Sequence, residues 1–230
     1  MKVIGLIGGM SWESTVGYYQ IINTVVKETM GGLHSAKCLL YSVDFAEIEA
    51  CQSSGDWDKS ARILTDAARR LECAGADLVL ICTNTMHKVA DQVAAEISIP
   101  LLHIAEVTAR ELLRQNVRRV GLLGTQYTME QAFYKAKLAE QNIEVLVPDE
   151  ADRKYLNHVI FHELCLGELR EASKREFLRI IAGLAEQGAQ GVILGCTEIG
   201  LLIRQEDTKV PLFDTTRIHA ESAARMAMRD

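Results

Sequence analysis

Residues 188–200 read Gly-Ala-Gln-Gly-Val-Ile-Leu-Gly-Cys-Thr-Glu-Ile-Gly, an apolar run that ends abruptly in a cysteine and polar residues. A short apolar run between glycines is typical of a strand in the middle of a parallel sheet. Ligands of open α/β sheets bind beyond the carboxyl ends of such strands. We therefore expect Cys196 to lie at a strand tip and take it as the first candidate for chemistry. The alternative is a buried, inert thiol, which is what most free cysteines are.

The same pattern occurs earlier in the chain. Residues 75–85 read Gly-Ala-Asp-Leu-Val-Leu-Ile-Cys-Thr-Asn-Thr and align without a gap at an offset of 113 residues, from 75 to 188. Thr83 then matches Cys196, whereas Cys82 matches Gly195. Neighbouring side chains on a strand point to opposite faces, so this pattern leaves open whether Thr83 or Cys82 faces the site.

Two more stretches repeat. Val120-Gly-Leu-Leu-Gly-Thr125 resembles Ile4-Gly-Leu-Ile-Gly-Gly9 at an offset of 116, and Val210-Pro-Leu-Phe-Asp-Thr215 resembles Ile99-Pro-Leu-Leu-His-Ile104 at an offset of 111. The chain therefore contains two copies of one βα unit. Strands that alternate with helices predict parallel sheets.

The expected fold is α/β, with two pseudo-symmetric domains that are each a parallel sheet flanked by helices. We expect a first domain over residues 1–104 and a second over 105–214, with a C-terminal helix at about 215–230 that packs back on the first. An active site is expected in the cleft between the domains, because each domain offers a polar strand tip to opposite sides of one small ligand.

The pattern of apolar residues also predicts the individual elements. Strands are expected at 2–7, 37–43, 78–82, 99–104, 120–125, 143–147, 191–194 and 210–215. Helices are expected after residues 10–15 up to about 29, from about 57 to 73, at 85–97, 105–116 and 152–166, from 173 to about 188, and at about 217–228. The pairs Thr128 with Gln131 and Ser173 with Glu176 have capping-box spacing and predict helix starts at Thr128 and Ser173.

Composition excludes several classes of protein. The net charge of −6 argues against binding to nucleic acid or to an anionic membrane surface. No apolar stretch approaches the ~20 residues of a membrane span, and the glycine-rich start is not a signal peptide, so we expect a cytoplasmic protein. The 6 cysteines show no C-x-x-C spacing, so neither a disulfide framework nor zinc is expected.

Gly8 and Gly9 precede a predicted helix, a place that suits a carboxylate held by backbone N–H groups. The stretch lacks the lysine of a phosphate-binding loop and the full spacing of a dinucleotide fingerprint. We therefore expect no nucleotide, pyridoxal phosphate or metal cofactor.

Two motifs resemble the aspartate/glutamate racemase superfamily. They are Leu194-Gly-Cys-Thr-Glu198 and the amino-terminal Ile4-Gly-Leu-Ile-Gly-Gly-Met10-Ser-Trp, and the resemblance covers the whole chain. It implies a cofactor-independent isomerase that acts on a small amino acid, has two α/β domains that each present a cysteine, and forms a homodimer.

The first cysteine motif departs from the family pattern, because the chain reads Cys-Thr-Asn-Thr-Met-His over residues 82–87. Alignment on Asn84, Thr85 and His87 puts Thr83 in the place of the family's cysteine, as the internal repeat does. The chain resembles a subgroup of enterobacterial racemases that acts on L-aspartate and L-glutamate and has this threonine. Thr83 and Cys196 are therefore the expected catalytic residues.

The resemblance implies that Met10 and Gln52 contact the substrate and that Asn84, Thr85 and Thr197 supply hydrogen bonds to its carboxylate or amine. We add Cys165 and Glu198, which lies close to Cys196 in the sequence, to the expected substrate-binding residues. Cys165 takes the place of a lysine that aspartate racemases commonly carry, which leaves room for neutral amino acids. Glu198 either bonds near the thiol or caps the following helix.

Cysteine suits the abstraction of an α-proton, because its pKa of ~8.5 leaves some thiolate near neutrality. Thr83 does not ionise easily and is a plausible proton donor but a poor base. His87 and His103 are interpreted as structural residues. The alternatives are a broad-specificity racemase of neutral amino acids, a one-cysteine decarboxylase or isomerase, and a non-catalytic amino-acid-binding protein.

Overall fold

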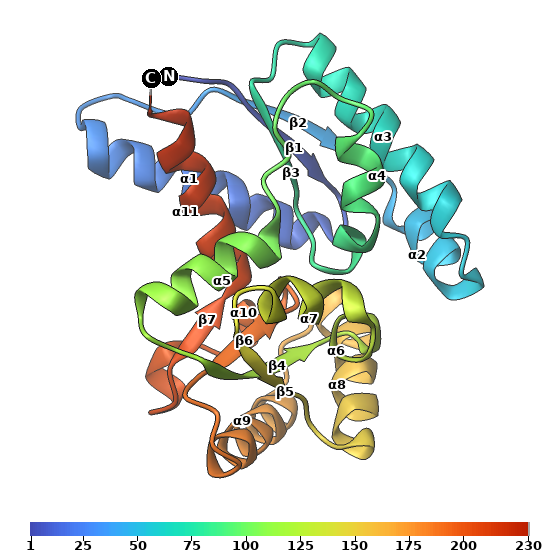
Figure 1. Cartoon of the computed structure of the whole chain (residues 1–230), viewed down its shortest axis with the longest axis vertical. Coiled ribbons are helices and arrows are strands. Elements are labelled where there is room, and N and C mark those ends of the chain that lie inside the picture. The colour runs from blue at the N-terminus through green and yellow to red at the C-terminus, as the bar shows by residue number, and fades with distance from the viewer. Residues whose placement is uncertain (230) are drawn as a thin grey trace. The chain divides into compact units, whose positions relative to one another are not determined.

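The structure is a computed structural model that describes residues 1–229 (Figure 1). The chain divides into two compact units. Unit 1 contains residues 1–104 and the chain from His219 onward, and unit 2 contains Ala105–Ile218. The chain therefore passes from one unit to the other after Ile104 and again after Ile218.

Unit 1 is built on a three-stranded parallel sheet in the order β2-β1-β3. Its elements are β1 (Ile4–Gly8), α1 (Trp12–Met30), β2 (Cys38–Ser42), α2 (Phe45–Ser54), α3 (Trp57–Cys73), β3 (Leu78–Ile81), the 3₁₀ helix η1 (Thr85–Val89), α4 (Ala90–Ala94) and most of α11 (Thr215–Ala227).

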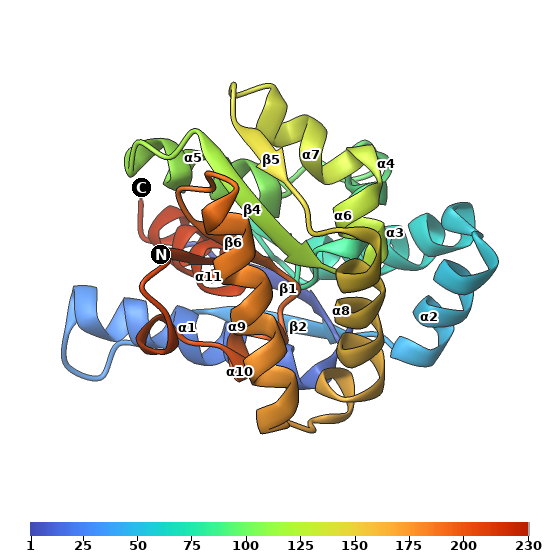
Figure 2. The same ribbon diagram turned by 90° about the horizontal axis from the view of Figure 1, so that it is seen from below.

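Unit 2 is built on a four-stranded parallel sheet in the order β5-β4-β6-β7, and α8 and α9 pack on β4 (Figure 2). Its elements are α5 (Ile104–Arg114), β4 (Arg119–Gly124), α6 (Gln126–Glu130), α7 (Ala132–Ala139), β5 (Glu144–Leu146), α8 (Glu150–His162), η2 (Leu164–Leu166), α9 (Glu171–Glu186), β6 (Val192–Gly195), α10 (Ile199–Leu202), η3 (Gln205–Asp207) and β7 (Leu212–Asp214). The predicted α/β fold with two parallel sheets is confirmed.

The strand pairing of the two units follows the internal repeat of the sequence. The matched pairs are Gly5 with Val79 and Gly121 with Val192, then Val79 with Leu101 and Val192 with Leu212. Each pair in unit 1 becomes the pair in unit 2 when the offsets 116, 113 and 111 of the three sequence repeats are applied. The sequence repeat is therefore also a repeat of hydrogen-bond register. Thr83 occupies the position in the sheet of unit 1 that Cys196 occupies in the sheet of unit 2.

Equivalent glycines let a helix approach the central strand of each sheet. A Cβ atom on Gly5 would lie 3.3 Å from the Cβ of Leu71 in α3, and one on Gly121 would lie 3.3 Å from the Cβ of Leu184 in α9. Close helix–strand packing of this kind requires a residue without a side chain. Both sheets consequently bury their central strands under a leucine at the same position of the repeat.

Apolar side chains cover both faces of the sheet in unit 1. One core cluster joins β1 and β3 to α3 and α4, and a second joins the other face of the same strands to α1 and α11. The second cluster includes Ala220, Ala223, Ala224 and Ala227 of α11, whose small side chains suit close helix packing. The C-terminal helix is therefore part of the core of unit 1 (Figure 1).

A buried histidine connects α11 to the rest of unit 1. His219 Nε2 lies 2.8 Å from the Leu102 carbonyl oxygen, and His219 Nδ1 lies 3.0 Å from the Tyr18 hydroxyl of α1. A carbonyl can only accept, so Nε2 carries the hydrogen and Nδ1 accepts from the tyrosine. Burial lowers the pKa of His219 from 6.5 to about 3, because the charged form would lose its hydration.

The strand predicted at 99–104 is reduced to a single bridge between Leu101 and Val79. The Pro100 carbonyl accepts from the Val79 N–H, but proline has no N–H to extend the ladder. The helix predicted at 85–97 is divided into η1 and α4 and ends at Ala94. The prediction of one continuous helix there was wrong.

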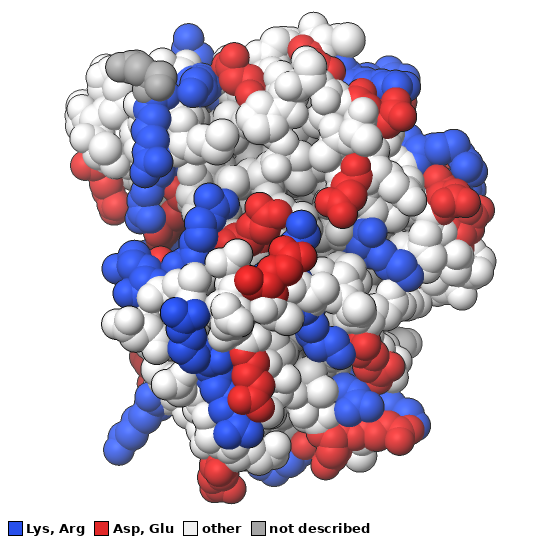
Figure 3. Space-filling view, viewed as in Figure 1, with Lys and Arg blue, Asp and Glu red and all other residues white. Residues whose placement is uncertain are grey.

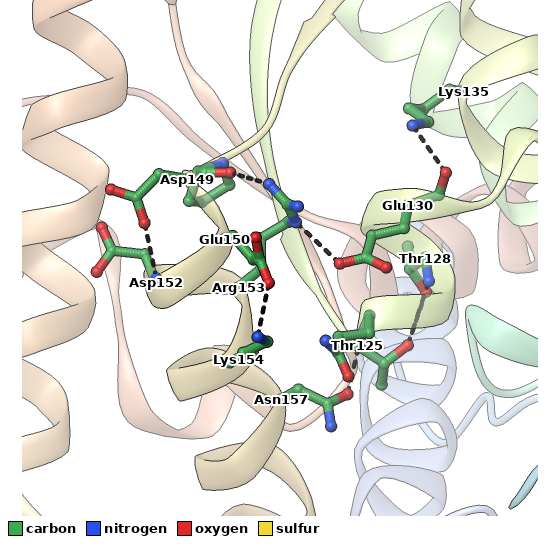
Figure 4. Close-up of polar contacts among 12 residues, drawn as sticks. Thr125, Thr128, Glu130, Lys135, Asp149, Glu150, Asp152, Arg153, Lys154 and Asn157 are labelled. Carbon is green, nitrogen blue, oxygen red and sulfur yellow. Dashed lines mark hydrogen bonds and ion pairs between the residues drawn. The ribbon is translucent and has the colours of Figure 1, made fainter.

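Neither predicted capping box forms. Thr125 caps α6 and accepts from the Thr128 N–H, so the capping residue lies three positions before the predicted Thr128 (Figure 4). The Gln126 N–H donates to Asn157 of α8. In α9, Ser173 lies inside the helix and its hydroxyl donates to the buried Glu163 at 2.6 Å. Local spacing alone did not distinguish a cap from a tertiary contact.

Charged side chains of both signs are interspersed on the face shown in Figure 3. Most ion pairs have at least one largely exposed partner, as in Arg70 with Asp66. Such pairs contribute little to stability. Within residues 1–229, no helix is long and apolar enough to cross a membrane.

We predict that the free energy of unfolding falls as the pH drops below 6.5, because the unfolded chain binds a proton at His219 before the folded chain does. At pH 5 the protonation of His219 in the unfolded chain lowers the free energy of unfolding by about 2 kcal/mol. His219→Gln keeps a donor for the Leu102 carbonyl and cannot titrate, so it should lose less stability between pH 7 and pH 5. Urea unfolding at both pH values measures the difference, and equal losses in the two proteins would contradict the prediction.

Candidate active site

Cys196 follows β6 directly, at the carboxyl end of the sheet in unit 2. Residues 192–195 are fully buried, and Gly195 pairs in register with Gly124 of β4. A Cβ atom on Gly195 would lie only 2.6 Å from the Leu123 carbonyl oxygen, so no side chain fits there. The thiol of Cys196 is the first reactive group beyond this close-packed strand, and the residue is 8% exposed.

The Cys196 thiol is hydrogen-bonded to a carboxylate. Its Sγ lies 2.9 Å from Glu198 Oε2, and the Thr197 hydroxyl donates to the same oxygen at 2.8 Å. Glu198 is 2% exposed, so this is a buried pair. A hydrogen bond to a charged group contributes about 1.5–3 kcal/mol, more than one between neutral groups.

The alternative role of Glu198, a helix cap, is wrong. Its side chain makes no capping bond to α10. The carboxylate instead accepts from the two residues before it in sequence.

Burial raises the pKa of Cys196 well above its ordinary value, and the negative charges of Glu198 and Cys165 raise it further. The thiol therefore keeps its proton at neutral pH, and that proton faces an acceptor. Cys165 is half-buried in η2 and is close enough for its charge to act on the Cys196 thiol. The predicted residues Cys165, Thr197 and Glu198 are thus brought together around Cys196.

Thr83 follows β3 in unit 1 and is half-buried. The Cys82 N–H donates to the Ile7 carbonyl at 2.9 Å, which continues the parallel ladder up to Thr83. The Cys82 side chain is fully buried in the cluster beneath α1 and α11. Burial and the nearby Cys38 raise the pKa of the Cys82 thiol well above its ordinary value. Cys82 therefore packs in the core, whereas the half-buried Thr83 retains access to solvent.

The other predicted residues of unit 1 are buried near the end of β3. Met10, Gln52, Asn84 and Thr85 are each 5% exposed or less. Gln52 Nε2 lies 3.1 Å from the sulfur of Met86, which places α2 against η1. Met10 and Met86 belong to one core cluster.

Sequence reasoning missed the contacts of His87. Its Nδ1 lies 2.8 Å from the Thr83 carbonyl oxygen and its Nε2 lies 3.1 Å from the Ile104 nitrogen. The i to i+4 spacing of Thr83 and His87 was the available signal, because it places a side chain over the preceding turn.

The sequence profile of the Asp/Glu/hydantoin racemases matches residues 7–223. The chain belongs to this family. Racemases are isomerases, so the predicted enzyme class is confirmed, as is the resemblance to the wider superfamily. The assignment to a subgroup with a catalytic threonine stays a prediction.

Several relatives resemble this racemase-family chain over nearly its whole length. A crystallised Yersinia pestis protein assigned to the Asp/Glu racemases is 54% identical, with full coverage of both chains and a TM-score of 0.92. An aspartate racemase homologue from Pyrococcus horikoshii is 38% identical, also with full coverage of both chains and a TM-score of 0.86. The broad-specificity amino-acid racemase RacX of Bacillus subtilis is 26% identical, and the alignment covers 96% of each of the two chains.

We predict that Glu198→Gln moves the alkylation of Cys196 by iodoacetamide to lower pH. The substitution removes a negative charge that raises the pKa of this thiol, so thiolate forms more easily. Mass spectrometry of the Cys196 peptide measures the rate, with the exposed Cys73 as an internal control whose pH profile should not move. An unchanged profile at Cys196 would show that the carboxylate does not act on the thiol.

Proposed function

We propose that this chain is a cofactor-independent amino-acid racemase in which Cys196 abstracts the α-proton of an L-amino acid. The observation that carries the proposal is the buried bond between the Cys196 thiol and the Glu198 carboxylate at a strand tip. Membership of a racemase family supports it. A thiol beside a carboxylate is an acid–base pair and needs no other group to accept its proton.

The first step is a proton transfer within the protein. The Sγ–H bond of Cys196 breaks and its proton moves to Glu198, which leaves a thiolate next to a neutral carboxyl group. Binding of a substrate with a cationic ammonium group favours this step, because a nearby positive charge lowers the pKa of a thiol. The thiolate then takes the α-proton, and the bonding electrons remain on the substrate as a carbanion.

The second step returns a proton to the other face of the α-carbon. We assign it to the Thr83 hydroxyl, which donates its hydrogen and is reprotonated from water, while Glu198 releases the proton it took from Cys196 and so neutralises the hydroxide that is left. Thr83 occupies in its sheet the register position of Cys196, which supports this role. Thr83 is only half-buried, which fits a residue that is reprotonated from water. The sharing of one substrate by both residues stays a prediction.

For the substrate we propose L-aspartate or L-glutamate, in line with the names of the relatives from Yersinia pestis and Pyrococcus horikoshii. The proposed contacts are those predicted from the sequence, with Asn84, Thr85 and Thr197 on the carboxylate or amine. Function as a homodimer is likewise proposed from family resemblance alone.

A second candidate is a racemase of broad specificity that accepts neutral amino acids. The observation that favours it is Cys165, which lies near Cys196 and supplies no positive charge for an acidic side chain. The similarity to RacX of Bacillus subtilis points the same way. A panel of L- and D-amino acids followed by circular dichroism separates the two candidates.

We predict that L-substrate becomes deuterated at the α-carbon in heavy water, with retained configuration, faster than it racemises. Cys196 is a good base, whereas Thr83 is a poor one, so D-substrate should exchange slowly. Thr83→Cys should speed the exchange of D-substrate by adding a second thiol. Proton NMR measures exchange and circular dichroism measures inversion. Equal exchange of both enantiomers, unaffected by Thr83→Cys, would assign the second face to another residue.

A further inference from the structure

His87 makes two directional hydrogen bonds that fix its protonation. The Ile104 backbone nitrogen can only donate, so Nε2 of His87 is an acceptor at 3.1 Å. The Thr83 carbonyl can only accept, so Nδ1 carries the hydrogen and donates at 2.8 Å. A neutral imidazole with its hydrogen on Nδ1 satisfies both bonds, and the doubly protonated ring would lose the bond to Ile104.

The surroundings of His87 keep this ring neutral. The side chain is 3% exposed, and its ring centroid lies 4.6 Å from that of His103 and 5.7 Å from that of His219. Burial, and then the charges that the two other histidines would carry, lower the pKa of His87 well below its ordinary value. Burial keeps His219 neutral by lowering its pKa to about 3, so it adds no charge at neutral pH.

The bond to Thr83 has no counterpart of the same kind at the other strand tip. At the offset of 113 residues, His87 corresponds to Gly200, which has no side chain to donate. The Cys196 carbonyl instead accepts from the Ile199 backbone N–H at 3.1 Å. The imidazole is therefore specific to the half of the chain that carries threonine.

We propose that His87 is a positioning residue for Thr83, a role that rests on the proposed function of that threonine. Its Nδ1–H holds the Thr83 carbonyl and so fixes the peptide plane that follows the strand. The plane sets the direction of the Thr83 side chain. A threonine hydroxyl transfers a proton well only when it is aligned with the reacting carbon, and a displacement of 1 Å can cost about 10² in rate.

Two substitutions separate the bonds of His87. His87→Asn places an amide donor near the former Nδ1 and keeps the bond to Thr83, whereas His87→Gln places an acceptor near the former Nε2 and keeps the bond to Ile104. Both remove one buried ring, so both should lower the unfolding temperature. The readout is the ratio of inversion to retained α-deuteration of L-aspartate or L-glutamate in heavy water.

We expect His87→Gln to lower this ratio by about 10², because only the inverting step uses Thr83. His87→Asn should stay within a few-fold of the wild type. His219→Gln is the matched control, because it alters the same cluster without touching Thr83, and its ratio should not change. Equal ratios in His87→Asn and His87→Gln would show a merely structural role for His87 and overturn the proposal.

Thr83→Ala distinguishes failure of this inference from failure of the proposed function. If Thr83→Ala leaves inversion unchanged, the assignment of Thr83 is wrong and the positioning role falls with it. If Thr83→Ala stops inversion but His87→Gln does not lower the ratio, the positioning role alone is overturned.

A measurement on the wild-type protein covers the case in which His87→Gln does not fold. Long-range ¹H–¹⁵N spectra of the imidazole should show hydrogen on Nδ1 of His87 from pH 8 to pH 6. Hydrogen on Nε2, or on both nitrogens within this range, would overturn the proposal.

Discussion

The mechanism proposed for this protein depends on one buried contact, the hydrogen bond from the Cys196 thiol to the Glu198 carboxylate. A thiol in an apolar strand tip holds its proton, and the adjacent carboxylate raises its pKa still further. The same carboxylate is the group that can take the proton away. In the proposed mechanism the pair is therefore inactive as a base until a positively charged substrate lowers the pKa of the thiol, so the reactive thiolate forms only when substrate is bound.

Strand register determines where the candidate residues lie. Parallel strands end at one edge of a sheet, so a polar residue directly after a buried central strand is presented at that edge. In both sheets the neighbouring strand is closely packed, by Leu71 over Gly5 of β1 beside β3 and by Leu184 over Gly121 of β4 beside β6. The two strand tips share a register but differ in chemistry. One carries the Cys196 thiol with its carboxylate partner, and the other carries the Thr83 hydroxyl, on a residue whose backbone carbonyl accepts from the His87 imidazole.

Much of the fold could be predicted from sequence, because the internal repeat of the sequence follows the hydrogen-bond register of the strands. The helix expected at about 57–73 is found at these residues. The failures have local causes. Pro100 limits a predicted strand to one bridge, and Ser173 forms a tertiary bond to Glu163 instead of a cap. The role of Glu198 stayed open because a carboxylate two residues after a cysteine can turn toward either the thiol or the next helix. Only the backbone geometry after β6 decides between them.

The central claim is that Cys196 is the base for the L-substrate and that Cys82 is a core residue. The most direct test is the rate of α-proton exchange of L-aspartate or L-glutamate in heavy water, measured by NMR for Cys196→Ala beside Cys82→Ala. Loss of a general base costs about 10²–10⁴ in rate, so Cys196→Ala should lose at least this factor with an unchanged unfolding temperature, whereas Cys82→Ala should exchange at nearly the wild-type rate. Equal losses in both proteins, with normal stability, would contradict the account.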